Sequence, residues 1–309
     1  MSTLSVVLAT KNEEENIGPC LESVKNLADE TVVFDEFSTD KTREVAKKYG
    51  AKVFEYQNKS NFHETKQKAI DKSSCDWILQ LDADERVTTE LATEIKIVIN
   101  SSNVELAPRL ICYPEVAAKI KEKGVSDEQL QLPKNVELFI RHQKLIERRE
   151  GKLGNHSSET VAFFVPRINF FLGAPLRHAG VYPDGVIRLF KKGKAWLPGK
   201  SVHELMDVDG GVGWLFNDLE HHESPTFSRY LERANRYTDL TAEQFKTNHV
   251  STDIFTLFYY SFVKPANVFF SLYIRHLGIL DGMRGFVWSC FSALHFTIAY
   301  FKYWQTVKK

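Results

Sequence analysis

Asp76-Trp77-Ile78-Leu79-Gln80-Leu81-Asp82-Ala83-Asp84-Glu85 is the stretch of sequence that decides the fold of this chain. Residues 77–81 form a short, mostly apolar run that predicts a buried strand. Acids follow the strand at once, so carboxylates are expected at the rim of a sheet. In open α/β sheets, ligands bind at the carboxyl ends of the strands. The stretch therefore predicts a ligand site at that edge.

Paired acids at a strand end are typical of a divalent-metal site. Mg²⁺ and Mn²⁺ prefer oxygen ligands, and proteins usually supply one or two carboxylates while phosphates and water complete the shell. Because side chains alternate along a strand, Asp82 and Asp84 are expected on the same side. One would hold the metal, and the other would reach a ribose hydroxyl or a water of the same cluster. The alternative is an acidic loop that caps a helix beginning near Thr88.

Strands and helices are expected to alternate before this stretch. Apolar runs predict strands at 4–9, 31–34 and 51–56, and a helical pattern follows each of them. Such alternation implies a parallel, doubly wound sheet, so the predicted fold class is α/β. Polar loops at 10–13, 35–40 and 82–85 would then share one edge. The sequence has neither GxGxxG nor GxxxxGK[ST], so a metal would have to neutralise the phosphates of a bound mononucleotide.

Composition excludes several classes of protein. The chain has 309 residues, 43% of them hydrophobic, enough for one large domain or one domain with an appendage. Lys and Arg number 40, as do Asp and Glu, so net charge does not favour nucleic acid. Cys20, Cys75, Cys112 and Cys290 lack metal-ligand spacing and predict reduced thiols. Residues 1–10 do not resemble a signal peptide and are expected to begin the first strand.

Several ordered motifs resemble the family 2 glycosyltransferases of the GT-A fold. The N-terminal motifs are Ser5-Val6-Val7-Leu8-Ala9-Thr10-Lys11-Asn12-Glu13-Glu14, Val33-Phe34-Asp35, Phe37-Ser38-Thr39-Asp40-Lys41-Thr42 and Leu81-Asp82-Ala83-Asp84-Glu85. Later motifs resemble the branch that includes bacterial lipopolysaccharide inner-core β-glucosyltransferases: Val165-Pro166-Arg167, Phe171-Leu172-Gly173, His178, Tyr182-Pro183-Asp184, Arg188-Leu189-Phe190, Val202-His203-Glu204 and Asn235-Arg236-Tyr237-Thr238. The resemblance covers residues 1–102 and 159–300.

The resemblance implies a Rossmann-like, mostly parallel central sheet flanked by helices, with a helical insertion and a C-terminal helical region that associates with membranes. The expected domains are a nucleotide-sugar half at 1–102, an insertion at 103–158, an acceptor half at 159–250 and an amphipathic, aromatic region at 251–309. The insertion lies outside the resemblance. It is expected to be a pair of helices or a mobile flap, and a solvated segment without a catalytic role is the favoured interpretation.

The resemblance also implies roles for single residues. The residues expected to bind the donor nucleotide are Thr10, Asn12, Glu13, Asp35, Lys66 and Asp82. Asp82, Asp84 and His203 are expected to hold Mg²⁺ or Mn²⁺, with His221 competing against His203 as a metal or diphosphate ligand. Glu36 departs from the family pattern, in which a small residue is usual.

Asp184 is the expected general base. Inverting transfer needs a group that deprotonates the acceptor hydroxyl on the face of the sugar opposite the departing nucleotide. Asp184 is the only acid in residues 180–192, and a strand is expected at 186–190. The alternative is a turn at Pro183-Asp184-Gly185, and a turn at a pocket mouth can also hold a base. Arg188 is expected to contact the acceptor.

Three arginines are expected to share one helix face, because Arg229, Arg233 and Arg236 recur at four- and three-residue steps. Arginine recognises phosphate through paired donors, so this face is expected to bind acceptor phosphates. The alternative is a solvated basic face paired with Glu232 and Asp239.

Residues 255–309 are rich in aromatic side chains and contain six Lys or Arg but one Asp. The longest apolar run, 286–300, is about 15 residues, whereas a spanning helix needs about 20. Amphipathic helices lying on an anionic membrane surface are therefore expected, at the cytoplasmic face of the inner membrane. A packed helical subdomain and a dimer interface are the alternatives.

These expectations combine into one predicted activity, the metal-dependent inverting transfer of a hexose. The donor is expected to be a UDP-sugar, the hexose glucose, and the acceptor a hydroxyl of a lipid-linked glycan such as the lipopolysaccharide inner core. A polyprenyl-phosphate sugar synthase and a non-catalytic membrane-associated scaffold are the alternatives. Glycoside hydrolysis is disfavoured, because a pair of hydrolytic carboxylates needs no metal-binding acid motif.

Overall fold

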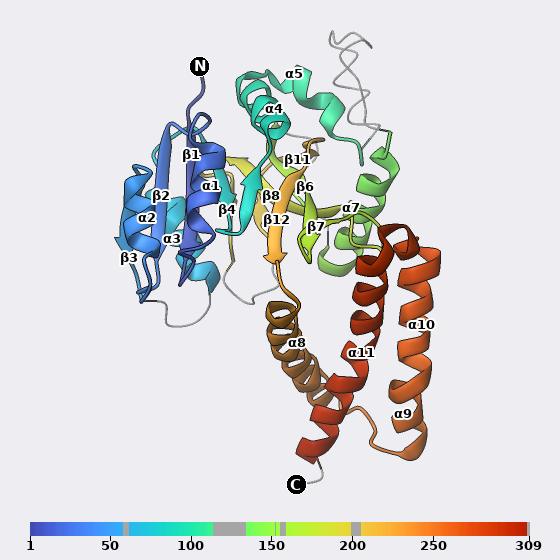
Figure 1. Cartoon of the computed structure of the whole chain (residues 1–309). Coiled ribbons are helices and arrows are strands. Elements are labelled where there is room, and N and C mark those ends of the chain that lie inside the picture. The colour runs from blue at the N-terminus through green and yellow to red at the C-terminus, as the bar shows by residue number, and fades with distance from the viewer. Residues whose placement is uncertain (58–61, 114–133, 152, 155–158, 199–204, 308–309) are drawn as a thin grey trace. The chain divides into compact units, whose positions relative to one another are not determined.

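The computed structural model describes residues 1–57, 62–113, 134–151, 153–154, 159–198 and 205–307 (Figure 1). The chain folds into two compact units. The first comprises Met1–Arg167 and Pro183–His221, and the second comprises Ile168–Tyr182 and His222–Lys309. Strands β6 (Thr160–Phe171) and β12 (Leu219–Ser224) contribute residues to both units.

The first unit begins with strands and helices in the predicted alternation. The elements are β1 (Leu4–Thr10), α1 (Ile17–Val24), β2 (Glu30–Asp35), α2 (Thr42–Lys48), β3 (Lys52–Glu55), α3 (Phe62–Lys72) and β4 (Trp77–Leu81). The strands pair in parallel in the order β3-β2-β1-β4. The parallel order puts the carboxyl ends of these strands at one edge and confirms the α/β class.

The sheet is mixed, because the strands that follow β4 mostly pair antiparallel. The later elements of the first unit are β5 (Glu85–Val87), α4 (Thr89–Asn100), α5 (Asn103–Leu106), η1 (Ala107–Arg109), α7 (Val136–Glu150), β8 (Asp184–Lys191), β9 (Ala195–Trp196), β10 (Asp207–Val208) and β11 (Gly211–Trp214). The strand order is β3-β2-β1-β4-β8-β6-β12-β5, β11 and β7 each pair with β6, and β9 pairs with β10 separately. Strand β8 runs antiparallel to both β4 and β6.

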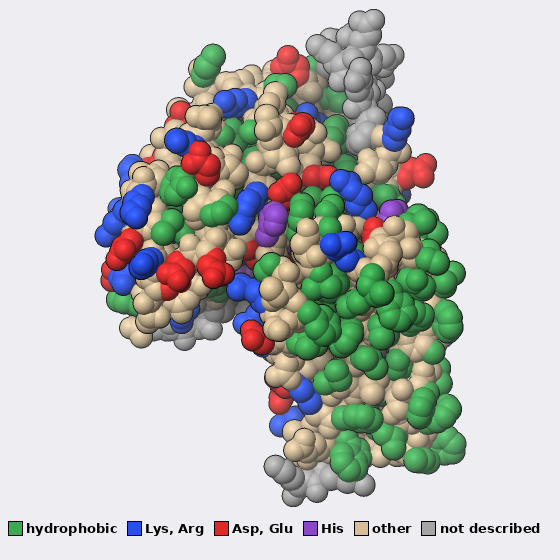
Figure 2. Space-filling view, in the orientation of Figure 1, with side chains coloured by type: hydrophobic (Ala, Val, Ile, Leu, Met, Phe, Trp, Pro, Cys, Tyr) green, Lys and Arg blue, Asp and Glu red, His purple; other side chains and the backbone are tan. Residues whose placement is uncertain are grey.

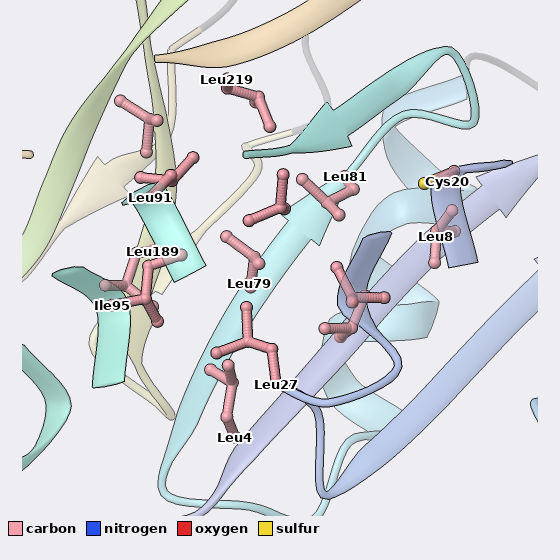
Figure 3. Close-up of a cluster of buried hydrophobic side chains, with 14 of the residues drawn as sticks. Leu4, Leu8, Cys20, Leu27, Leu79, Leu81, Leu91, Ile95, Leu189 and Leu219 are labelled. Carbon is pink, nitrogen blue, oxygen red and sulfur yellow. The ribbon is translucent and has the colours of Figure 1, made fainter. Parts of the chain in front are cut away.

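The core of the first unit lies between the sheet and helices α1 and α4 (Figure 3). Alternation along β1 directs Leu4, Val6 and Leu8 into this cluster. Helix α1 adds Ile17 and Leu21, and α4 adds Leu91 and Ile95. Helix α3 contacts β1 and β2, but none of its described residues belongs to the cluster, so α3 covers the opposite face.

Helix α7 of the insertion is packed into the first unit. The ring of Phe139 is fully buried and stacks on Trp214, with the ring centroids 4.8 Å apart. Trp214 Nε1 donates a hydrogen bond to Gln143 Oε1 at 2.8 Å. Gly185 of β8 lies directly against the Trp214 ring, so a Cβ added at this position would be only 2.3 Å from the ring. The described helix is therefore part of the core and not a solvated appendage; residues 114–133 lie outside the described part of the insertion.

The second unit consists of helices together with β7 and the ends of β6 and β12. Its elements are β7 (Ala174–Leu176), α8 (Phe227–Thr247), α9 (Ile254–Phe258), η3 (Tyr259–Val263), α10 (Lys264–Phe270), η4 (Ser271–Arg275), η5 (Gly278–Asp281) and α11 (Gly282–Val307). Phe245 of α8 packs on Tyr300 and Tyr303 of α11. The helical C-terminal region is confirmed. Among the described residues, no helix combines the length and apolar character needed to span a bilayer.

The burial of Phe139 predicts that α7 stabilises the first unit. We expect Phe139→Ala to lower the free energy of unfolding by about 3–5 kcal/mol, because it leaves a cavity against Trp214. Leu145→Ala on the same helix is the control, since that side chain is 52% exposed and its loss should cost about 0.5 kcal/mol or less. Urea unfolding of the two variants makes the comparison. Equal, small effects would mean that α7 does not belong to the core.

Candidate active site

Polar side chains at the carboxyl ends of β1 and β2 form one hydrogen-bonded cluster. Asp35 is fully buried and accepts hydrogen bonds from the Ser38 amide at 2.8 Å, Ser38 Oγ at 2.6 Å and Thr10 Oγ1 at 3.2 Å. Asn12 has a left-handed backbone with φ 55°, and its side-chain oxygen accepts from the Thr39 amide at 2.8 Å. The structure thus brings Thr10, Asn12 and Asp35 to one edge. Their contact with a nucleotide stays a prediction.

Glu13, which is predicted to bind the nucleotide, and Glu36 follow the same strands. The Glu13 carboxylate accepts a hydrogen bond from Asn16 Nδ2 at 2.7 Å, and its amide donates to Thr42 Oγ1 at 2.8 Å. Glu36, the departure from the family pattern, accepts a hydrogen bond from Thr65 Oγ1 of α3. The extra acid is therefore held by a neighbouring helix.

Asp82 lies between two cations directly after β4. Its Oδ1 is 2.5 Å from Lys66 Nζ, and its Oδ2 is 2.5 Å from Arg188 Nη2. Burial alone would raise the pKa of Asp82, but the charges of Arg188 and Lys66 outweigh it and hold the pKa well below the usual range. Asp82 is therefore ionised, and both of its oxygens are engaged by cations in this arrangement.

A second acid, Glu85, is fully buried and continues this row of charges. Its Oε1 is 2.7 Å from Arg188 Nη2 and 3.1 Å from Arg167 Nη1, and its Oε2 accepts from the Asp82 amide at 2.9 Å. Burial would lower the pKa of Arg188, but Asp82 and Glu85 raise it above the ordinary arginine value. The sequence predicted acceptor contacts for Arg188. In the structure Arg188 is 6% exposed, and its guanidinium lies against the acid motif.

Asp84 lies close to His221, a histidine on β12, near the end of the sheet opposite β3. Its Oδ2 is 3.6 Å from Nε2 of His221, which lies on β12 in register with Glu85 of β5. Both side chains are mostly shielded from solvent, with side-chain exposures of 16% and 9%. His221 is the alternative that the sequence set against His203, and His203 lies outside the described residues.

A carboxylate and an imidazole fit a divalent cation. Carboxylate oxygen suits Mg²⁺ and Mn²⁺, and imidazole is a common ligand of first-row metals. Among the described residues, no group of three or more His, Cys, Asp or Glu side chains is arranged to hold a metal. Asp84 and His221 would therefore supply two ligands, and phosphate oxygens or water would have to complete the shell. Asp82 is also a predicted metal ligand. It could bind the metal only if Lys66 or Arg188 moved away from its carboxylate.

Asp184 is the first residue of β8, opposite Arg167 in the register with β6. Its Oδ2 is 2.6 Å from Arg167 Nη2. The amide of Gly185 donates to Nε2 of His142, from α7, at 3.1 Å. Burial lowers the pKa of His142, against smaller raising effects from the Gly185 backbone and the Asp184 charge. Asp184 thus begins a strand, instead of lying in the middle of a turn, and a guanidinium holds its carboxylate.

The three predicted phosphate-binding arginines lie on α8 in the second unit. Arg233 pairs with Glu223, and its guanidinium lies 5.9 Å from the ring centre of Tyr237. Arg236 lies 5.8 Å from the same ring. The side chain of Arg233 is thus already partnered, and phosphate binding by this face stays a prediction.

Three residues of the site had no role predicted from the sequence. Glu85 follows the acid pair directly, so its position in the motif was a usable signal. Arg167 belongs to a quoted motif, Val165-Pro166-Arg167, but its partners are far away in sequence. His142 lies in the insertion, where nothing in the sequence marked it.

Comparison with known proteins matches the N-terminal third of the chain to one family. Residues 5–107 match the family model described as glycosyl transferase family 2. An uncharacterised glycosyltransferase of Rickettsia typhi is 36% identical over 137 residues, which are 44% of each chain. The chain thus spans less than half the length of the Rickettsia relatives that it matches first.

A second kind of relative matches along nearly the whole chain. The lipopolysaccharide core biosynthesis glycosyltransferase LpsC of Rhizobium meliloti is 24% identical over 308 residues, 98% of this chain and 92% of the relative. Among solved structures, glucosyl-3-phosphoglycerate synthase of Mycobacterium tuberculosis, in complex with Mg²⁺ and uridine diphosphate, is 24% identical. The match covers 33% of this chain and 41% of that chain, with a TM-score of 0.29.

The pairing of Asp84 with His221 predicts how metal binding responds to mutation. We expect Asp84→Asn and His221→Ala each to weaken Mn²⁺ binding by about tenfold or more in the presence of a saturating nucleoside diphosphate, since each removes one of two protein ligands. Electron paramagnetic resonance of free Mn²⁺ measures this. The adjacent His222→Ala is the control, because the ring of His222 stacks on Phe170 at 4.2 Å. Unchanged binding in His221→Ala would remove His221 from the site.

Proposed function

We propose that this protein, whose residues 5–107 belong to glycosyl transferase family 2, transfers a hexose from a UDP-sugar to a hydroxyl of a lipid-linked glycan. The hexose is proposed to be glucose, and the acceptor a glycan such as the lipopolysaccharide inner core. The match to LpsC along 98% of this chain supports an acceptor of this class. The reaction is proposed to be metal-dependent and to invert the anomeric centre.

One observation carries the donor half of the proposal: Asp84 and His221 meet at the sheet edge where Asp82 and Lys66 also lie. A divalent cation held by Asp84 and His221 would stabilise the charge that develops on a departing diphosphate. Lys66 and Arg188 add two cationic side chains close to that edge. The hydrogen-bonded cluster of Thr10, Asn12 and Asp35 offers polar groups for the base and ribose.

Asp184 is the proposed general base. The acceptor oxygen attacks the anomeric carbon, its proton passes to a carboxylate oxygen of Asp184, and the bond from the anomeric carbon to the diphosphate oxygen breaks. The departing diphosphate takes the bonding electrons. Because the acceptor attacks from the face opposite the diphosphate, an α-linked donor gives a β-linked product. Arg167 supports this role, because a guanidinium 2.6 Å from Asp184 Oδ2 fixes the carboxylate and favours its ionised form.

The proposed partner of the second unit is the anionic inner face of the cytoplasmic membrane. Hydrophobic side chains gather on the surface of α9, α10 and α11 (Figure 2), where Phe255 is 83% and Met283 75% exposed. A patch of this kind marks an interaction surface. Residues 255–309 carry six Lys or Arg against a single acid, and that acid, Asp281, pairs with His178 at 2.9 Å. The resulting positive charge suits anionic lipid.

The proposed base is tested by Asp184→Asn. We expect turnover to fall by about 100-fold or more, because the acceptor proton loses its carboxylate, while donor affinity stays within a few-fold. The measurement is UDP release from UDP-glucose in the presence of purified truncated lipopolysaccharide, with UDP binding measured by calorimetry. Asp209→Asn is the control, since that side chain is 64% exposed and pairs with Lys194. Normal turnover in Asp184→Asn would contradict the assignment.

The membrane proposal is tested by replacing Phe255 and Phe262 with serine together. Each phenylalanine that enters the interface is worth about 1.5–3 kcal/mol, so we expect the affinity for phosphatidylglycerol vesicles to fall by at least about tenfold. Vesicle co-sedimentation measures this, and Ile97→Ser, a change at a 60% exposed residue of the first unit, is the control. Unchanged vesicle binding, with loss of a dimer in analytical ultracentrifugation, would assign the face to a second copy.

A further inference from the structure

Six charged side chains in the first unit form an unbroken row of alternating sign. The successive contacts are Lys66 to Asp82 at 2.5 Å, Asp82 to Arg188 at 2.5 Å, Arg188 to Glu85 at 2.7 Å, Glu85 to Arg167 at 3.1 Å, and Arg167 to Asp184 at 2.6 Å. Three cations and three carboxylates alternate, so the row is neutral as a whole. It begins at the proposed donor site and ends at the proposed base.

We propose that Glu85 and Arg167 are positioning residues that couple Asp82 of the donor site to the base Asp184. The role of Asp184 as a base rests on the proposed function, whereas the coupling itself does not. Neither residue is expected to touch the reacting atoms, because Glu85 is fully buried and the side chain of Arg167 is 14% exposed.

Glu85 is the junction of the row. Its carboxylate receives hydrogen bonds from the Asp82 amide, Arg188 and Arg167, so it fixes the turn after β4 and both guanidiniums at once. Burying an ionised carboxylate away from water costs free energy unless it is paired in this way. Through β5, Glu85 also lies in register with His221 of β12. The third acid of the motif thus ties the metal-binding pair to the two arginines.

Arg167 is the bridge between Glu85 and the base. Its Nη1 donates to Glu85 Oε1 at 3.1 Å, and its Nη2 donates to Asp184 Oδ2 at 2.6 Å. Only a forked side chain binds two carboxylates with fixed geometry, so lysine would not replace it. Arg167 also lies directly across from Asp184 in the β6–β8 pairing, which holds the backbone beneath both side chains.

Because Arg167 pairs with both Glu85 and Asp184, we expect it to affect the proton affinity of Asp184 less than an arginine paired with Asp184 alone. An arginine paired with Asp184 alone would favour the carboxylate strongly and make it a poor proton acceptor. The negative charge of Glu85, on the other side of Arg167, offsets part of that effect. Within the described part of the chain, His142 also reaches this end of β8, through Gly185, and burial and the charge of Arg149 lower its pKa. Arg167 and Glu85 thus both contribute to the charge balance at Asp184.

The test is direct titration of Asp184 by NMR, in protein labelled with carbon-13 at the aspartate carboxyl carbons. Loss of one signal in Asp184→Asn identifies the residue. In Arg167→Gln we expect the titration midpoint to move to higher pH by about one unit, because the carboxylate loses its cation. In Glu85→Gln we expect it to move to lower pH by roughly half a unit, because Arg167 then serves Asp184 alone.

Opposite shifts are the result that a purely structural role would not produce. Glu94→Gln is the control, because Glu94 is also a buried acid that pairs with an arginine, Arg109, and it should leave the midpoint unchanged. Shifts in the same direction, or none, would overturn the proposal. Should Arg167→Gln fail to fold, the direction in Glu85→Gln decides alone. The titration needs no substrate, so a wild-type protein without UDP-glucose turnover would count against the proposed function and leave this result standing.

Discussion

Two neighbouring carboxylates at the turn after β4 hold this structure together: Glu85, which is fully buried, and Asp82, whose side chain is 24% exposed. A buried carboxylate must be paired and hydrogen-bonded, because its desolvation would otherwise cost a large part of the free energy of unfolding. Lys66 from α3, Arg188 from β8 and Arg167 from β6 meet that requirement. Elements that are far apart in sequence are therefore held against one turn of the chain.

The arginines that pair with these acids come from the part of the sheet in which the strands turn antiparallel, beyond β4. Parallel strands with helices on both faces form the nucleotide-binding type of edge, and β8 then pairs antiparallel with β4. This pairing turns Arg188 toward the acids and leaves Asp184 at the start of β8, facing Arg167 on β6. Helix α7 supports that strand from the other side through Trp214, which leaves no room for a side chain at position 185. The proposed donor site and the proposed base thus lie on neighbouring strands of one sheet.

Local pattern was enough to predict the strands and helices through β4, because alternating apolar runs and helical periodicity are short-range signals. It was also enough to place Asp82 and Asp84 after a buried strand. The partners of these acids were not predictable, since Arg188 lies more than a hundred residues away and its pairing depends on the direction of β8. The approach of His221 to Asp84 likewise depends on the β5–β12 register, whereas His203 lies outside the described residues. The burial of α7 was not predicted, because the helix is rich in charged residues and lies outside the family motifs.

The edge formed by β1, β2 and β4 is proposed to bind a nucleotide sugar together with a divalent metal. A thermal-shift panel of UDP-, GDP-, CMP- and dTDP-sugars with Mn²⁺, Mg²⁺ or EDTA tests this proposal. We expect UDP-sugars to raise the melting temperature by about 5 °C at a hundredfold excess over Kd, and EDTA to remove the shift. Failure of every nucleotide sugar to shift the melting temperature in the presence of metal would contradict it, as would a UDP-sugar shift that persists in EDTA.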